Sequence, residues 1–251
     1  MRRYPSPYAS SFSFGPGPVS SAIKAIIAAN VVMFLLTTLL ASRSIDLVAI
    51  LGLRPAAVIH QLWIWQPFTY MFLHGGLLHI LFNMLALWMF GTELERIWGT
   101  RYFVKFYFVT GIGAGLLTIF VSLLGFSVTN FIYAVPTIGA SGAIYGLLLA
   151  YALYFPDRPI YMYFLFPVPA KVFVAIMGAI AFYASLAEAG GIANATHLGG
   201  LVVGYAMLKG SRLHPMAELK YRYLKWRINR VRKKFDVYSG GRADDVDRRV
   251  H

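Results

Sequence analysis

The sequence predicts an all-α membrane protein with six transmembrane helices, both chain ends in the cytoplasm, and a long membrane-associated loop between helices 1 and 2. Hydrophobic residues make up 58% of the 251 residues and charged residues only 13%, whereas a soluble domain carries about a quarter charged residues. Mean hydropathy is +0.62. The apolar residues gather in stretches close to the roughly 20 residues that a helix needs to cross a bilayer.

The six predicted spans are residues 22–41, 69–91, 102–124, 138–155, 169–187 and 193–208. The fourth and sixth are short and contain glycine, which is typical of helices that begin inside the membrane beside a water-holding cavity. The stretch between the first two spans, residues 42–68, is rich in apolar and aromatic residues. We expect this loop to lie in the outer interface with its tryptophans at headgroup depth, the alternative being a plain connector.

The charges divide the chain into a membrane domain and two tails. The net charge is +13, from 23 Lys and Arg against 10 Asp and Glu. With both ends in the cytoplasm, 21 of the 23 basic residues fall on that side, as the positive-inside rule favours. The predicted parts are a flexible N-terminal tail at 1–20 without a signal-peptide core, the membrane domain at 21–208, and a basic tail at 209–251.

The basic tail has apolar residues interspersed among its cations. This pattern predicts an amphipathic surface helix on anionic lipid, followed by a disordered end. Nucleic-acid binding is the less favoured alternative, and we expect no nucleic-acid partner.

Polar residues inside a span are costly and are candidates for function. His79 and Asn83 lie four residues apart in the second span, so they share one helix face. His74 precedes Gly75-Gly76 and would lie about 180° from Asn83 on a straight helix. We therefore expect His74 at the end of the loop rather than on the same stripe.

A serine and a histidine in two later spans form the second constellation. Ser141 lies in a Gly-x-Ser-Gly string that opens the fourth span, and His197 shares a face of the sixth span with Gly200 and Gly204. Small residues allow two helices to approach closely. We expect the two faces to meet, so that His197 can act as the base that a serine nucleophile needs.

The shortage of acids narrows the chemistry further. Asp157 and Glu188 are the only acids between Lys105 and Lys209, and both fall at predicted loop positions. The sequence therefore predicts a Ser–His dyad rather than a triad, with Tyr145 orienting the imidazole and Asn194 bonding water or backbone. Intramembrane aspartyl and HExxH zinc proteases are excluded, and without cysteine a thiolate site is impossible. We expect no metal and no cofactor.

Each motif also has a structural explanation on its own. A Gly-x-Ser-Gly string is usually helix packing, and a His-x3-Asn pair can simply tie two helices together. A membrane-protein chaperone or scaffold therefore stays open as the alternative function. A channel or transporter is disfavoured because the sequence shows no inverted repeat and no charged pathway.

Together these motifs resemble the rhomboid family of intramembrane serine proteases over about residues 60–207. The matching motifs are His-x4-His-x3-Asn (His74, His79, Asn83), Gly-x-Ser-Gly (Gly139 to Gly142) and His-x2-Gly-x3-Gly (His197, Gly200, Gly204). The resemblance implies a six-helix bundle in which Ser141 is the nucleophile and His197 the base. It implies further that His79 and Asn83, with the Ser141 amide and the Gly139 turn, line an oxyanion or substrate site, and that Tyr145 stacks on His197.

The resemblance also implies substrates and a location. The substrates would be single-span membrane proteins cut in or near their transmembrane segments, and the location a bacterial inner membrane in contact with its lipids. Glu95 resembles a family position at the inner end of helix 2, and residues 184–192 the loop that caps the site. One departure is Trp65-Gln66 in place of the family's Trp-Arg pair, which puts the anchoring of the first loop in doubt.

Overall fold

The computed structural model describes residues 17–125, 127–162, 166–185 and 191–212. The chain divides into two compact units, Met1–Leu208 and Lys209–His251. The second unit is described only as far as Arg212, where it continues a helix of the first. The predicted tails, residues 1–20 and 209–251, therefore lie mostly outside the described residues.

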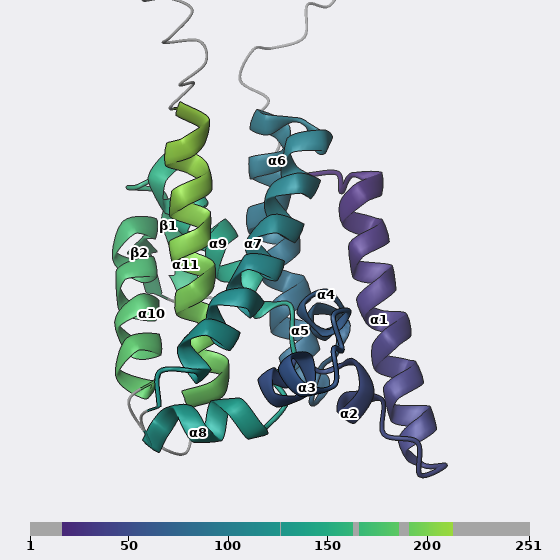
Figure 1. The fold of residues 1–251 in the computed structure, drawn as a ribbon. Helices are drawn as coiled ribbons and strands as arrows, with labels where there is room; N and C mark the ends of the chain where they lie inside the picture. Colours follow the sequence, from purple (N-terminus) through teal and green to yellow (C-terminus); the bar gives the residue numbers. More distant parts are fainter. Residues whose placement is uncertain (1–16, 126, 163–165, 186–190, 213–251) are drawn as a thin grey trace, which may run out of the picture. The chain divides into compact units, whose positions relative to one another are not determined.

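The described first unit is built mainly of helices (Figure 1). In chain order its elements are α1 (Ser21–Ala41), α2 (Leu47–Leu51), α3 (Pro55–His60), α4 (Gln66–Thr69), η1 (Tyr70–Phe72), α5 (Leu77–Ala86), η2 (Leu87–Gly91), α6 (Thr92–Trp98), α7 (Thr100–Ser122), α8 (Ser127–Ala134), α9 (Ser141–Tyr154), β1 (Pro159–Met162), β2 (Phe166–Pro169), α10 (Ala170–Ser185) and α11 (Gly191–Arg212).

Each of the six predicted spans overlaps a helix in the structure. Within the described residues, α1, the segment Leu77–Trp98 and α7 are long and apolar enough to cross a membrane by length and composition, while α9 and α10 are shorter apolar helices. The protein is thus a helical membrane bundle. That all six segments cross, and in which direction, stays a prediction.

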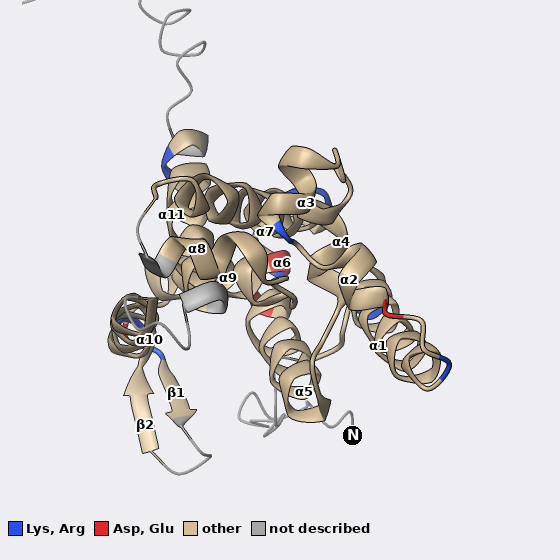
Figure 2. Ribbon diagram, turned by 60° about the horizontal axis from the view of Figure 1, so that its bottom comes forward, with Lys and Arg blue, Asp and Glu red and all other residues tan. Residues whose placement is uncertain are grey.

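The bundle has two ends, which we name the loop end, formed by α2, α3 and α8, and the Ser20 end, where α1 begins (Figure 1). Most of the ribbon is uncharged, and the charged residues are confined to short stretches (Figure 2). Helix α9 is apolar around its whole circumference, and most of its residues are buried. Such a helix belongs in the middle of a bundle, and this places the residues at its start inside the protein.

The second predicted span is corrected by the structure. The helix starts at Leu77 and continues to Trp98 through η2, a short π-helical stretch, instead of running from 69 to 91. The residues before it fold separately into α4 and η1. Gly76 lies in an extended conformation just before α5, which ends the preceding structure and lets the new helix start.

A strand hairpin corrects the all-α prediction, and one further helix adds to the predicted spans. Strands β1 and β2 form an antiparallel hairpin between α9 and α10, and α8 is a short helix that hydropathy did not mark. The sixth predicted span is also longer than expected, because α11 runs from Gly191 to Arg212. Of the two spans predicted to be short, the fourth and the sixth, only the fourth is a short helix in the structure, α9.

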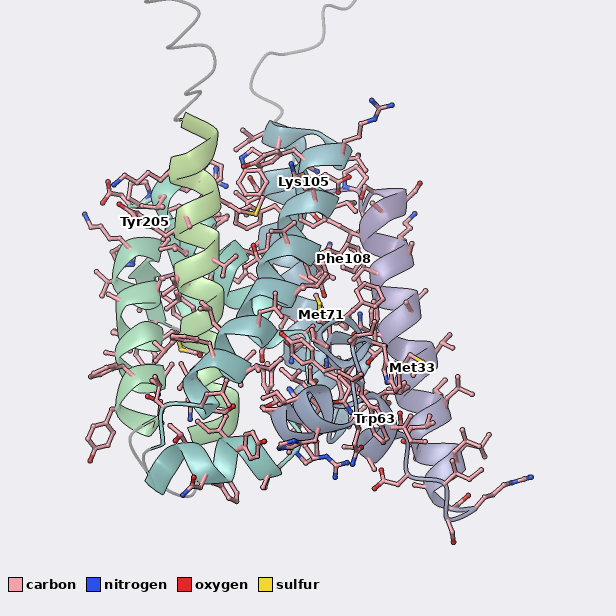
Figure 3. The ribbon with its side chains drawn as sticks, in the orientation of Figure 1. Met33, Trp63, Met71, Lys105, Phe108 and Tyr205 are labelled. Atoms are coloured by element: carbon pink, nitrogen blue, oxygen red, sulfur yellow. The ribbon has the colours of Figure 1, made fainter. Side chains whose placement is uncertain are left out.

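The loop before α5 packs into the bundle through the segment Tyr70–Phe72. Met71 lies in the interior (Figure 3), where its side-chain methyl occupies the space that a Cβ on Gly111 of α7 would need. The tip of the loop is different, since the Trp63 and Trp65 rings stack on each other and Leu62 and Ile64 are exposed. This arrangement suits the predicted interfacial position.

Gln66 anchors this loop despite lacking the charge of an arginine. Its side chain is fully buried. Its Oε1 accepts a hydrogen bond from Arg54 N at 3.0 Å, and its Nε2 donates to Ile50 O at 3.2 Å. Trp65 Nε1 donates to the same carbonyl oxygen at 3.0 Å. The neutral side chain of Gln66 therefore anchors the loop through two hydrogen bonds, although the arginine of the family is missing.

Replacing Gln66 by alanine is expected to lower the free energy of unfolding by about 1–3 kcal/mol, because the partly buried Arg54 N–H loses its acceptor. Thermal unfolding of the purified protein measures this loss. Gln61→Ala is the matched control, since Gln61 is an exposed glutamine of the same loop. Equal unfolding temperatures for the two variants would show that Gln66 does not anchor the loop.

The Ser20 end is held by a buried carboxylate. Glu95 at the end of α6 accepts hydrogen bonds from Ser20 Oγ and from Thr100 Oγ1, the latter at 2.7 Å. Ser20 also caps α1, because its Oγ accepts from Ile23 N at 3.2 Å. One side chain thus joins the start of α1, the end of α6 and the start of α7.

Candidate active site

Ser141 is the first residue of α9, and the turn before it is held by backbone hydrogen bonds. Leu53 and Thr137 exchange two of these bonds, at 2.9 and 2.8 Å, so the first loop braces the chain just ahead of the helix. Gly139 N then donates to Tyr70 O at 2.9 Å. Gly139 adopts φ +121°, a conformation that L side chains rarely adopt. The hydroxyl of Ser141 is therefore fixed by both its helix and its turn.

His197 on α11 faces this serine. Its Nε2 lies 2.8 Å from Ser141 Oγ, although the two residues are 56 positions apart. The close approach depends on glycines at the α9–α11 contact, because a Cβ on Gly200 would overlap the carbonyl oxygen of Gly142. One turn further, a Cβ on Gly204 would lie 3.0 Å from Gly146 Cα. The two small-residue faces meet, as their spacing predicts.

The imidazole of His197 is oriented by an aromatic ring. Tyr145, one turn after Ser141, stacks on it with ring centroids 4.2 Å apart and planes inclined by 5°. Among the described residues, none makes a hydrogen bond to His197 Nδ1. Asp157 is exposed and pairs with Lys171 at 2.7 Å, while Glu188 lies outside the described residues. The described part of the chain therefore supplies no carboxylate to this imidazole.

His79 approaches the serine turn from α5. A Cβ built on Gly139 would lie 2.8 Å from His79 Nε2 and 3.7 Å from Ser141 Oγ. His79 Nδ1 accepts a hydrogen bond from Gly75 N at 3.3 Å. Because Nδ1 accepts, the neutral ring carries its proton on Nε2. A donor is thus directed at the space beside Ser141.

The other predicted site residues take more varied places. Asn83 Nδ2 donates to His79 O at 2.8 Å, which occupies one of its two N–H groups. The amide of Gly139 is already bonded to Tyr70 O, so this glycine shapes the turn instead of offering a donor. His74 lies before α5, off the His79–Asn83 stripe, with its ring 5.0 Å from that of His79. Asn194 lies one turn before His197 on α11.

Tyr70 is a residue of the site that the sequence did not reveal. It is fully buried, and its hydroxyl donates to Gly111 O at 2.7 Å and lies 3.0 Å from where a Cβ on Gly142 would be. Its carbonyl oxygen accepts a hydrogen bond from Gly139 N. Tyr70 therefore contacts the turn on both sides of Ser141, but in a sequence a tyrosine beside apolar residues cannot be distinguished from a core residue.

Thr196 was also missed. Its hydroxyl hydrogen-bonds that of Thr118 on α7 at 2.8 Å, next to His197 in the chain. This bond fixes the rotation of α11 relative to α7. Threonine is common in membrane helices, so nothing in the sequence marks it.

The described residues contain no group of three or more histidine, aspartate or glutamate side chains that could hold a metal ion. The site thus consists of one hydroxyl, one imidazole and nearby donors. Such a set can perform acyl transfer.

The part of the chain that contains these residues is similar to known proteins. Residues 61–211 match the family model described as the Rhomboid domain. Rhomboid protein 1 of Saccharomyces cerevisiae mitochondria is 34% identical over 53% of this chain and 38% of its own length. Rhomboid protease GluP of Bacillus subtilis is 30% identical over 71% of this chain and 32% of its own length.

A third relative is Rhomboid protease GlpG of Pectobacterium atrosepticum, 31% identical over 59% of this chain and 48% of its own length. In each case the matched region covers less than half of the relative. Two of the three are named as proteases.

Proposed function

This chain belongs to the rhomboid family, and we propose that it is an intramembrane serine endopeptidase that uses Ser141 and His197 as a catalytic dyad. The observation that carries the proposal is the 2.8 Å contact between Ser141 Oγ and His197 Nε2. It is supported by relatives that are named rhomboid proteases. The experiment is the incubation of purified protein in liposomes with a model single-span membrane protein, followed by mass measurement of the products.

In the proposed first step, Ser141 Oγ attacks the scissile carbonyl carbon while its proton passes to His197 Nε2. The tetrahedral intermediate collapses as the C–N bond breaks, and His197 gives the proton to the leaving amine. Water then attacks the acyl-enzyme carbonyl with His197 again as base. The ester C–O bond breaks, His197 returns the proton to Ser141 Oγ, and the carboxylic acid leaves. Stacking on Tyr145 fixes the orientation of the His197 imidazole. In a triad, the acid side chain has this orienting role.

The developing oxyanion is stabilised at the start of α9. The first amides of a helix have no partner within it, and in α9 the amides of Ser141, Gly142 and Ala143 precede the first helix-closing bond, from Ile144 N to Ala140 O at 3.1 Å. They carry the positive end of the helix dipole. His79 Nε2 and the second N–H of Asn83 complete the proposed donor set.

His79→Ala and Asn83→Ala are each expected to lower kcat by about 10²–10³-fold with little change in KM, because their donors act on charge that exists only in the transition state. Cleavage kinetics in liposomes measure both constants. Asn130→Ala is the matched control, since Asn130 is exposed on α8. If both variants fold and turn over at the rate of the control, these two side chains have no oxyanion role.

The proposed substrates are single-span membrane proteins. A membrane helix has its carbonyl groups hydrogen-bonded, so a substrate must unwind locally before Ser141 can attack. Segments with glycine, proline or polar residues near one membrane face are therefore preferred. A protein acting only as a scaffold would bind such a segment and leave its mass unchanged.

The proposed location is a bacterial inner membrane with both chain ends in the cytoplasm. Support comes from the 21 of 23 basic residues that this orientation puts on one side. In the structure, α1 begins at one end of the bundle. The part of α11 that belongs to the first unit runs towards the same end (Figure 1). Reporter fusions at each terminus test the orientation.

A further inference from the structure

The hairpin of β1 and β2 exposes large apolar side chains outside the helical bundle. In its register Ile160 pairs with Val168, Tyr161 with Pro167 and Met162 with Phe166. Ile160 is buried against the bundle, whereas Tyr161 is 59% and Phe166 64% exposed. The strands extend away from the helices (Figure 2). An exposed apolar surface of this kind usually marks a contact with another molecule or a membrane.

The charged residues nearest to the strands lie at the root of the hairpin, by which we mean residues 156–158 and 170–171. Arg158 bonds Glu93 of α6 at 2.8 Å, and Lys171 bonds Asp157 at 2.7 Å. Backbone bonds from Ala170 N to Arg158 O and from Lys171 N to Pro156 O close the root. From Pro159 to Ala170 the sequence has no charged residue. Charged root and apolar strands are thus separated along the chain.

The location of the hairpin sets its depth relative to the membrane. It follows the last turn of α9, whose 14 residues are about 21 Å long at 1.5 Å per residue. The root therefore lies at the opposite end of α9 from Ser141. Because a hydrocarbon core is about 30 Å thick, a helix that starts inside the membrane brings this root to the boundary between lipid and water.

The helix that follows the hairpin, α10, also exposes apolar side chains. This helix follows β2 directly and exposes a row of apolar side chains: Val172, Ile176, Ile180, Phe182 and Tyr183. A membrane helix with such an outer face borders lipid. The same lipid is then the nearest apolar partner for Tyr161 and Phe166.

The backbone of the hairpin limits how deep it can go. A two-stranded hairpin leaves edge groups without a partner, which cannot lie in hydrocarbon. Three of its eight strand residues are proline, at positions 159, 167 and 169, and proline has no N–H to leave unpaired. The edge carbonyl oxygens still need water. These features fit the headgroup region and not the hydrocarbon core.

From these observations we infer that the β1–β2 hairpin is an interfacial membrane anchor, whose Tyr161 and Phe166 side chains insert among phospholipid headgroups on the face opposite Ser141. Aromatic side chains favour this depth. The charged root stays in water and fixes the level of α9 and α10. The inference does not require Ser141 to be catalytic, so the two proposals fail or hold separately.

The chain has no cysteine, so single labelling sites can be introduced without removing native ones. Tyr161→Cys and Phe166→Cys are each labelled with an environment-sensitive NBD fluorophore in the full chain, in liposomes. Asp157→Cys at the exposed root is the matched aqueous control, and Ile180→Cys on α10 is the lipid control. Quenching is measured with aqueous iodide and with lipids carrying nitroxide near the headgroup.

We expect labels at positions 161 and 166 to emit at shorter wavelength than the label at 157. Iodide quenching should be several-fold weaker at these two positions, and quenching by the nitroxide lipids correspondingly stronger. Iodide quenching equal to that at 157, without quenching by the nitroxide lipids, overturns the inference. Protection that disappears when the lipid-to-protein ratio is raised assigns the surface to a second copy of the chain and equally overturns it.

Discussion

Replacing Ser141 by alanine is expected to reduce cleavage of a single-span substrate by as much as about 10⁶-fold, to the background of the assay. In the proposed mechanism His197 Nε2, 2.8 Å away, takes the proton of this hydroxyl, and alanine leaves nothing to attack the carbonyl. Product formation in liposomes over a fixed time measures the loss.

The control for Ser141→Ala is Ser42→Ala, which removes an exposed hydroxyl at the end of α1. This variant should cleave at the rate of the unmodified protein. His197→Ala should lose about as much activity as Ser141→Ala, and the double variant no more than either, because the pair acts as a unit. Cleavage by Ser141→Ala at the control rate would contradict the dyad.

The second large effect concerns the contact between α9 and α11. Gly200→Ala is expected to lower the free energy of unfolding by about 1–3 kcal/mol or more, because the new Cβ would overlap the carbonyl oxygen of Gly142. Moving α11 outward also separates His197 from Ser141, and a misplacement near 1 Å can cost about 10²-fold in rate. Both stability and cleavage should therefore fall together.

Gly210→Ala provides the matched control on the same helix. Among the described residues, a Cβ at Gly210 would meet no atom within 4 Å, and alanine is the better helix former by about 1 kcal/mol. This variant should unfold at the same or a slightly higher temperature. If Gly200→Ala unfolds like Gly210→Ala, the close glycine contact is not what holds the two helices at catalytic distance.

The meeting of Ser141 and His197 could be predicted because helix periodicity is regular. Glycines three and four residues apart define one face on each helix, and a nucleophile and base that both lie on such faces are brought together when the helices pack. The stacking of Tyr145 follows from the same spacing, one turn after Ser141. The relative positions of side chains on regular helices can therefore be predicted from the sequence.

Elements set by local turns and long-range hydrogen bonds could not be predicted in the same way. The hairpin between α9 and α10 lies in the connection that separates the fourth and fifth predicted spans, but hydropathy does not indicate that this connection pairs as two strands. Tyr70 joins η1 to α7 and to the Gly139 turn, contacts that exist only after the chain has folded. The start of α5 was misplaced because α4 and η1 are apolar too.

Gln66 shows a related limit of motif comparison. Where the family has arginine, the sequence indicates a lost charge, but the structure shows that the position needs an acceptor for Arg54 N and a donor for Ile50 O. Glutamine provides both. The physical requirement of a buried site is its hydrogen bonds, and more than one residue type can meet it.

Covalent labelling distinguishes a Ser141 that is activated by His197 from an ordinary serine. A fluorophosphonate probe bonds to an activated serine oxygen with loss of fluoride, and peptide mass mapping locates the adduct. We expect one adduct, on Ser141, which is absent from His197→Ala while Asn130→Ala is labelled normally. An adduct on a different residue, or equal labelling of Ser141 in His197→Ala, would contradict the activation of Ser141 by His197.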